Sequence, residues 1–363
     1  MSLSPSELAR DPLFQLNAVL WLAQPLPDTD GIIPLLFRKG FSVYAIAPLL
    51  APPPDVRLAA GNAHILLQER VRPDVVLTHS GARKFSFCEC KGGSFAPAPQ
   101  ARTLLVVAGP RAAEVLGLAP HEVSASMLNL VVPETNRERT EATLAEVSGP
   151  LAGAGIPPGE SSVVGLEVIA LEADRASICV IMDTRGAEFF QLPTGANPFI
   201  KFEPGADARP LYFIPYDPDV IQSDEEAAFC RRVLFERMHS TILAAIGHAA
   251  VPCQLAFTSR GVLNDAMFGM YGQWENLDSA KHMRQLCRQF MNALMQAVNS
   301  AVPNAIGYRP GDAWYVALQS PEGHEKTVDA VARFSCETLD LKALPPPGLF
   351  DDLAEDGPAT NLC

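Results

Sequence analysis

Long apolar runs are missing from this chain of 363 residues. Nowhere does it approach the roughly 18 uninterrupted apolar residues that a membrane-spanning helix needs. Its first residues, MSLSPSELARDPL, lack the basic stretch followed by an apolar stretch that a secretory signal has. Charged residues are also sparse, at 19%, whereas apolar residues reach 48%, which is typical of a folded chain with sizeable cores. We therefore expect a folded protein without a membrane segment, located in the cytoplasm.

Several chemical signatures are missing as well. The eight cysteines form no CxxC pair and no Cys/His spacing typical of a zinc site, so we expect reduced thiols. The sequence contains no GxGxxG, GxxxxGK[ST], GxSxG or HExxH motif. Nucleotide cradling, serine hydrolysis and zinc proteolysis therefore lack their usual motifs.

Negative charge is in excess, but it is distributed unevenly. The net charge is −13, and residues 1–130 carry 11 Lys and Arg against 10 Asp and Glu, whereas residues 131–363 carry 17 against 31. Such a chain does not resemble a protein that coats nucleic acid through a uniformly basic surface. The acidity belongs to the second part of the chain.

Hydrophobic periodicity and turn residues predict a mixture of helices and strands in the first part of the chain. The expected order is a helix at 11–23, a strand at 41–50, a helix at 58–71, strands at 73–79 and 84–91, short helices at 97–109 and 110–118, and a strand at 127–134.

The second part of the chain begins with a change of composition. Capping-box patterns at Thr135–Glu138 and Ser223–Glu226 predict helix starts, two further strands are expected between them, and the apolar stripe over 278–300 predicts a long amphipathic helix. The length favours two domains. We expect an α/β (α+β) protein with a first domain at 1–155, an acidic α+β domain at 156–342 and an unstructured tail at 343–363.

One predicted hairpin combines two acids and a lysine. Asp74 begins its first strand, and Glu89 and Lys91 lie two residues apart on its second strand, so both point to one face. Two carboxylates suit Mg²⁺ or Mn²⁺, with the backbone carbonyl of Cys90 as a third oxygen. A lysine beside such a metal can orient water and neutralise charge on a phosphate. The pattern indicates phosphodiester hydrolysis.

These residues resemble the PD-(D/E)xK nucleases, which have the restriction-endonuclease-like fold. The match consists of Pro73-Asp74, fourteen intervening residues and Glu89-Cys90-Lys91, and it covers about residues 40 to 130. The resemblance implies a mixed sheet flanked by helices, Asp74 and Glu89 as metal ligands, and Lys91 as the residue that positions water. It also implies two possible auxiliary residues, Glu69 on the preceding helix and Gln100 on the following one. The family places a further strand before the Asp strand. Either residues 41–50 supply this strand from upstream, or the core is a variant of the family fold.

Three functions remain open at this stage. The first is a metal-dependent endo- or exodeoxyribonuclease, with DNA as substrate and a second copy or a basic protein as possible partner. The second is a binding or scaffold protein that keeps the fold without turnover, and the third is a small-molecule enzyme with its site in the second domain. The candidate nucleic-acid contacts are Arg70, Arg72, Arg83, Lys84, Lys281, Arg284 and Arg288.

Overall fold

The computed structural model describes residues 4–26, 32–93, 97–172, 175–202, 212–220, 223–309, 313–336 and 339. The chain forms two compact units. The first consists of Met1–Phe213 with the short segment Gln273–Asn276, and the second of Ile214–Gly272 with Leu277–Cys363.

The first unit contains a mixed sheet of seven strands that follow one another in chain order. Adjacent strands pair antiparallel except for β3 with β4 and β4 with β5, which pair in parallel. The strands are β1 (Phe41–Ile46), β2 (Val75–His79), β3 (Lys84–Cys90), β4 (Ala125–Pro133), β5 (Glu160–Glu172), β6 (Arg175–Met182) and β7 (Gly195–Phe202).

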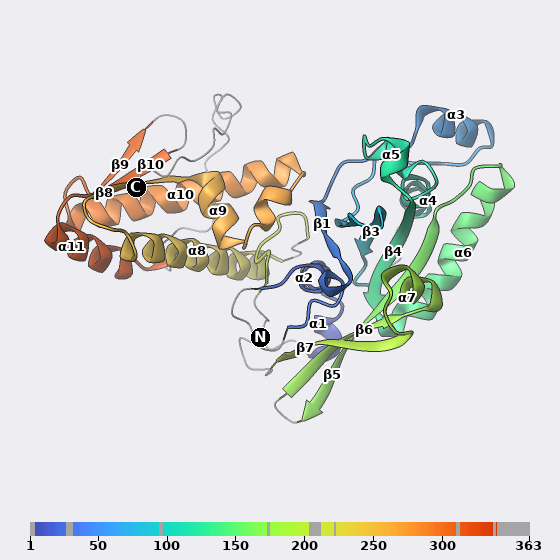
Figure 1. Cartoon of the computed structure of the whole chain (residues 1–363), viewed down its shortest axis with the longest axis horizontal. Coiled ribbons are helices and arrows are strands. Elements are labelled where there is room, and N and C mark those ends of the chain that lie inside the picture. The colour runs from blue at the N-terminus through green and yellow to red at the C-terminus, as the bar shows by residue number, and fades with distance from the viewer. Residues whose placement is uncertain are drawn as a thin grey trace. The chain divides into compact units, whose positions relative to one another are not determined.

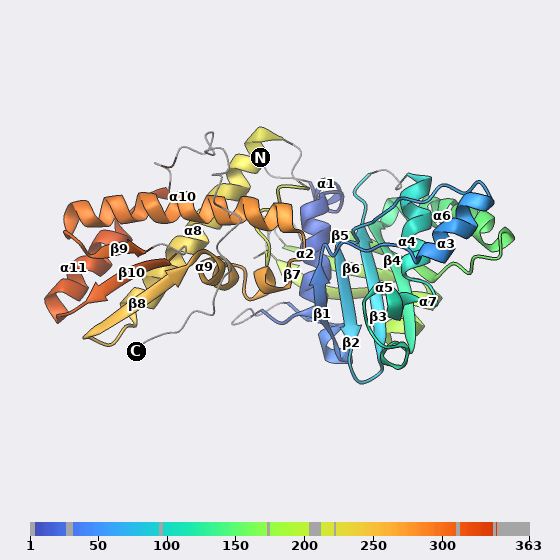
Figure 2. The same ribbon diagram turned by 90° about the horizontal axis from the view of Figure 1, so that it is seen from above.

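Two parallel pairings require crossovers, and helices supply both. Helix α4 (Ala98–Val107) connects β3 to β4, and α6 (Arg137–Gly153) connects β4 to β5. Both helices cover one face of the sheet, and α2 (Pro12–Ala23) covers the other (Figures 1 and 2). The remaining helices of this unit are α1 (Pro5–Leu8), α3 (Pro54–Asn62), α5 (Ala112–Val115) and α7 (Thr184–Phe190), with short 3-10 turns η1 (Phe37–Lys39), η2 (Pro120–Glu122), η3 (Glu134–Asn136) and η4 (Met270–Gln273), which extends from the second unit into this one.

Helix α2 is apolar on nearly every side, as expected of a helix that is wholly buried. Its first turn is fixed by Asp11, whose side chain accepts a hydrogen bond from the backbone N–H of Leu13, and by Pro12, which is pre-organised for a first helical turn. Phe14 and Trp21 are fully buried and meet edge to face with ring centroids 5.8 Å apart. The helix predicted at 11–23 is confirmed.

The second unit is a three-stranded antiparallel sheet with helices, in the strand order β8-β10-β9. The long helix predicted at 278–300 is confirmed, and most of its apolar stripe is buried. The helix start predicted at Ser223 is also confirmed, because the Ser223 side chain caps the helix that begins at Asp224. The elements are α8 (Asp224–Gly247), β8 (Cys253–Thr258), α9 (Ser259–Ala266), α10 (Leu277–Ala301), β9 (Ile306–Arg309), β10 (Ala313–Leu318) and α11 (Pro321–Ala332). None of the described helices has the length and apolar character needed to cross a membrane.

The division into units differs from the boundary expected after residue 155. Strand β5 begins at Glu160 and pairs in parallel with β4, for example through Leu130 and Val163. A boundary after 155 would therefore divide one sheet. The segment around residue 155 instead joins the end of the crossover helix α6 to the start of β5. The expected tail at 343–363 lies outside the described residues.

Two local predictions were wrong. The helix expected at 58–71 is α3, Pro54–Asn62, because Pro54 favours an earlier start and His64 takes a left-handed conformation, with φ of 57°, that ends it. Leu66, which lies beyond the end of α3, is 69% exposed. The capping box expected at Thr135 does not form, since α6 has Asn136 as its N-cap, with no side-chain capping bond.

Candidate functional site

The hairpin of β2 and β3 brings Asp74 and Glu89 face to face. Val75 pairs with Cys88 and Val76 with Phe87, so the same register sets Asp74 opposite Glu89. Directly opposed residues of antiparallel strands project to the same face, with their Cβ atoms about 4.5–5.5 Å apart. This is the face that α4 and α6 cover, because Val76 and Phe87 belong to the core beneath those helices.

The side chains predicted to form the site do meet. Oδ2 of Asp74 accepts a hydrogen bond from the backbone N–H of Cys90 at 2.5 Å. Oε1 of Glu89 lies 2.7 Å from Nζ of Lys91 and accepts a second hydrogen bond from Nε2 of Gln100 at 3.0 Å. Oε2 of Glu89 is buried and has no hydrogen-bond partner in the part of the chain that the structure describes. Both donors therefore approach one carboxylate oxygen and leave the other without a partner.

Burial dominates the electrostatics of this cluster. It raises the pKa of Asp74, although the N–H of Cys90 and the charge of Lys91 act in the opposite direction. Burial, followed by the charge of Asp74, raises the pKa of Glu89 to about 8. Burial lowers the pKa of Lys91, but the carboxylates of Glu89 and Asp74 together raise it above its ordinary value. Near neutral pH, Glu89 therefore tends to hold a proton, and Lys91 keeps its charge.

The backbone of Lys91 is fixed by one neighbour within the sheet and one on a covering helix. Its N–H donates to the carbonyl of Val131 on β4 at 2.8 Å, and its carbonyl accepts from Nε2 of the fully buried Gln15 on α2 at 3.3 Å. Gly92 follows, and a Cβ at that position would collide with the backbone carbonyl of Arg10. Glycine is therefore needed at 92 for this close approach.

The donor set fits a hydrated Mg²⁺ or Mn²⁺. A buried carboxylate oxygen without a partner is costly unless a proton or a cation satisfies it, and Oε2 of Glu89 is such an atom. Asp74 and Glu89 are the hard oxygen ligands that these ions take. Among the described residues, no group of three or more His, Cys, Asp or Glu could hold a metal. The site therefore offers two carboxylates and would leave the other positions to water and substrate, while ligation by the Cys90 carbonyl stays a prediction.

Of the two auxiliary residues, the structure brings only Gln100 to the site. Gln100 lies in the first turn of α4 and contacts Glu89. Glu69 is exposed and lies outside the helix that was expected to carry it, because α3 ends at Asn62. The expectation of Glu69 on a preceding helix was therefore wrong.

Two of the basic residues, Arg83 and Lys84, are separated from the acidic cluster by the length of strand β3. Arg83 and Lys84 lie at its turn, where Arg83 donates to the carbonyl of His121 and Lys84 donates to the carbonyl of Phe189 and lies over its ring. Six residue steps of β3 separate Lys84 from Cys90, about 20 Å at the usual strand rise. Arg83 and Lys84 are therefore too far from Asp74 and Glu89 to share a substrate phosphate with them.

The other predicted contacts lie in two places. Arg70 is exposed and Arg72 half-buried in the segment that leads into β2, so both remain candidates. Lys281, Arg284 and Arg288 lie half-buried on α10 in the second unit. Lys281 and Arg288 each have an interaction partner.

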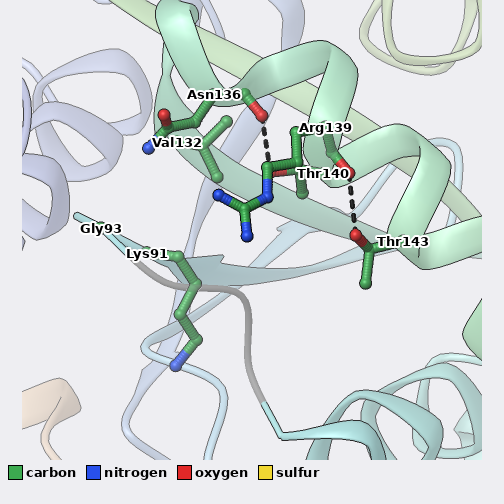
Figure 3. Close-up of a pocket in the computed structure, with 7 residues that line it drawn as sticks. All are labelled: Lys91, Gly93, Val132, Asn136, Arg139, Thr140 and Thr143. Carbon is green, nitrogen blue, oxygen red and sulfur yellow. Dashed lines mark hydrogen bonds between the residues drawn. The ribbon is translucent and has the colours of Figure 1, made fainter.

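A hollow beside Lys91 was not predicted. It holds a volume of about 30 Å³, enough for one or two water molecules. Arg139 from α6 and Asn136, the N-cap residue of that helix, line it opposite the end of β3 (Figure 3). The lining is completed by Lys91, Gly93, Val132, Thr140 and Thr143.

A sequence signal for this hollow does exist. Positions 136, 139, 140 and 143 are polar and spaced three and four residues apart, which places them on one face of a helix. The pattern does not show that this face lies beside Lys91, because that depends on the pairing of β3 with β4.

Comparisons with models of known protein families, with curated proteins and with solved structures found no match to this chain.

Proposed function

We propose that this protein is a metal-dependent nuclease of the PD-(D/E)xK type that hydrolyses phosphodiester bonds, with DNA as the expected substrate. The observation that carries the proposal is the cluster in which Asp74 lies opposite Glu89 while Lys91 and Gln100 both contact Oε1 of Glu89. The order of elements supports it: α2, three antiparallel strands, α4 and a parallel fourth strand agree with the helices and mixed sheet that the resemblance implies. Strand β1 pairs antiparallel with β2, which suits the further strand that the resemblance implies before the Asp strand.

The side chains suggest a division of labour. Asp74 and Glu89 would hold Mg²⁺ or Mn²⁺, which when bound supplies Lewis-acid polarisation of the phosphate and acidifies a water molecule. Lys91 keeps its proton because its pKa is raised, so it acts as a hydrogen-bond donor and not as a base. It would orient the attacking water or neutralise charge on the phosphate. Gln100 would hold the Glu89 carboxylate in place from α4.

Cleavage of a labelled DNA duplex and of a single strand by the full chain tests this proposal. We expect hydrolysis with Mg²⁺ or Mn²⁺ and none with a chelator. Asp74→Asn and Glu89→Gln should abolish it, and Lys91→Ala should lower its rate about 100-fold or more. Lys39→Ala is the matched control, since Lys39 is exposed and precedes β1 at the opposite end of the sheet from Asp74. Equal cleavage by the Lys91 and Lys39 variants would exclude the mechanism.

A nuclease-like binding protein without turnover is the second candidate. Two features favour it: the net charge of −13 disfavours nucleic acid, and the pKa of Glu89 near 8 disfavours cation binding at neutral pH. Folded wild-type protein that cleaves neither substrate from pH 7 to 9 in an excess of Mg²⁺ or Mn²⁺ would support this candidate over the nuclease.

A further inference from the structure

The first turns of α6 lie beside the end of β3 for a topological reason. Strands β3 and β4 are parallel, so they end at the same edge of the sheet, and the chain turns from β4 through η3 directly into α6. Lys91 bonds to Val131 one residue before the hollow-lining Val132. This pairing brings Asn136 and Arg139 to the side of Lys91, although about fifty residues separate them in sequence.

Two donor side chains at the start of α6, those of Asn136 and Arg139, have no partner among the described residues. Arg139 is exposed, and neither its guanidinium nor the side-chain amide of Asn136 forms a hydrogen bond or ion pair with any residue in the described part of the chain. Thr140 and Thr143 donate their hydroxyl protons within the helix, to the carbonyls of Asn136 and Arg139 at 2.8 and 2.9 Å. Figure 3 shows the guanidinium extending from α6 into the space beside the end of β3.

The acids around this face are already neutralised in part. Arg137 binds Glu134 through Nε at 3.0 Å and Glu141 through Nη1 at 2.9 Å. These pairs occupy Arg137 and leave Arg139 as the arginine of α6 that faces the hollow, where Lys91 is the other cation. A guanidinium offers five donors in a planar fork that matches a phosphate, and the amide of Asn136 adds two more.

We propose that Arg139 and Asn136 form a phosphate-binding subsite that holds the nucleic-acid strand by a phosphate next to the one at Asp74, Glu89 and Lys91. This inference rests on the proposed nuclease function for its substrate, but its contacts involve neither carboxylate. Arg139 is a positioning residue: it fixes the strand, while Lys91 acts at the scissile phosphate.

Binding of a fluorescent 12-nucleotide single strand to the full chain, measured in a chelator at several salt concentrations, tests the subsite without turnover. Arg139→Ala should weaken binding about three- to tenfold and reduce the slope of log K against log salt by about 0.7, the value of one phosphate contact on a single strand. Arg139→Lys should restore much of the salt slope, since it keeps the charge. Arg38→Ala is the control, because Arg38 is exposed on η1 before Phe41, which pairs with the end of β2 farthest from Asp74.

Two forms of the strand identify the phosphate. An equal Arg139→Ala effect on strands with a 5′-hydroxyl and a 5′-phosphate assigns a backbone phosphate to the subsite, and an effect confined to the phosphorylated strand assigns a terminal one. Equal affinities and salt slopes for the Arg139 and Arg38 variants overturn the subsite, as does a wild type that binds neither strand. If the Arg139 effect is present but metal-dependent cleavage by the wild type is not, the subsite stands and the nuclease function fails.

Discussion

Lys91 and Gln100 both approach Oε1 of Glu89, at 2.7 and 3.0 Å, while Oε2 of the same carboxylate is buried without a partner. The two donors come from different elements, β3 and α4, so the packing of the helix on the sheet fixes the orientation of the carboxylate. A symmetric, fully satisfied ion pair would leave no reason for a cation to bind. The one-sided arrangement instead leaves one oxygen of Glu89 buried without a partner, on the residue that the strand register sets opposite Asp74. A divalent cation between the two acids would relieve the cost of burying them.

The first prediction concerns stability and pH in the absence of metal. The pKa of Glu89 is raised by burial and by Asp74 from 4.5 to about 8. A carboxyl whose folded pKa is raised favours folding below its unfolded pKa, and this contribution is lost as pH rises through the folded value. The free energy of unfolding should therefore fall between about pH 5 and pH 8.5. Gln does not titrate, so the free energy of unfolding of the Glu89→Gln variant should fall less over the same pH range. Denaturant titrations at several pH values measure this difference.

The slope with pH, and not the absolute stability, carries this test. Glu89→Gln also removes the ion pair to Lys91, which shifts its stability at every pH. Parallel pH profiles for the wild type and the variant would show that Glu89 titrates near its ordinary value.

The second prediction concerns metal affinity. Binding requires Glu89 to lose its proton, so the affinity for Mg²⁺ or Mn²⁺ should rise by up to about tenfold per pH unit below pH 8 and level off above it. Saturating metal should raise the melting temperature of the wild type but not that of Asp74→Asn or Glu89→Gln. Calorimetry in two buffers of different ionisation enthalpy should detect one proton released at pH 7. An affinity independent of pH would contradict the raised pKa.

The local part of the site was predictable from the sequence. A hairpin with a period of two fixes which residues share a face, so Asp74, Glu89 and Lys91 could be grouped from spacing alone. Strand length also separates Arg83 and Lys84 from these three residues, because the distance along a strand grows by about 3.3 Å per residue.

The non-local parts were not predictable. Whether β5 continues the first sheet depends on parallel pairing with β4 across a helical crossover, and no local pattern encodes that pairing. A second non-local pairing, of β3 with β4, places Arg139 beside Lys91. The end of α3 was missed for a different reason: the apolar residues Ile65, Leu66 and Leu67 favour a longer helix, but the chain leaves the helix before them.

The third prediction concerns Gln100, which touches Glu89 but would not touch the substrate. Its removal leaves Oε1 with Lys91 alone, so the carboxylate is less well held and its pKa rises further. Gln100→Ala should lower metal affinity or activity by about 10- to 100-fold and move the pH profile of cleavage to higher pH. Gln68→Ala is the control, since Gln68 is exposed and only its backbone N–H bonds, to Thr103. A loss of activity without any shift of the pH profile would contradict a role through Glu89.

The fourth prediction separates two adjacent glycines that follow Lys91. A Cβ on Gly92 would collide with the backbone carbonyl of Arg10, whereas one on Gly93 would meet nothing within 4 Å. Backbone cannot move aside as the end of a flexible side chain can, so Gly92→Ala must displace either the turn before α2 or the carbonyl of Lys91 that Gln15 holds. Overpacking of this kind costs about 1–3 kcal/mol, and a shift of about 1 Å in a catalytic group can cost about 100-fold in rate.

Gly92→Ala should therefore lower both the free energy of unfolding and the cleavage rate at saturating metal, while Gly93→Ala should change neither by much. Equal behaviour of the two variants in denaturant titrations and cleavage assays would show that the contact between Gly92 and Arg10 does not position Lys91.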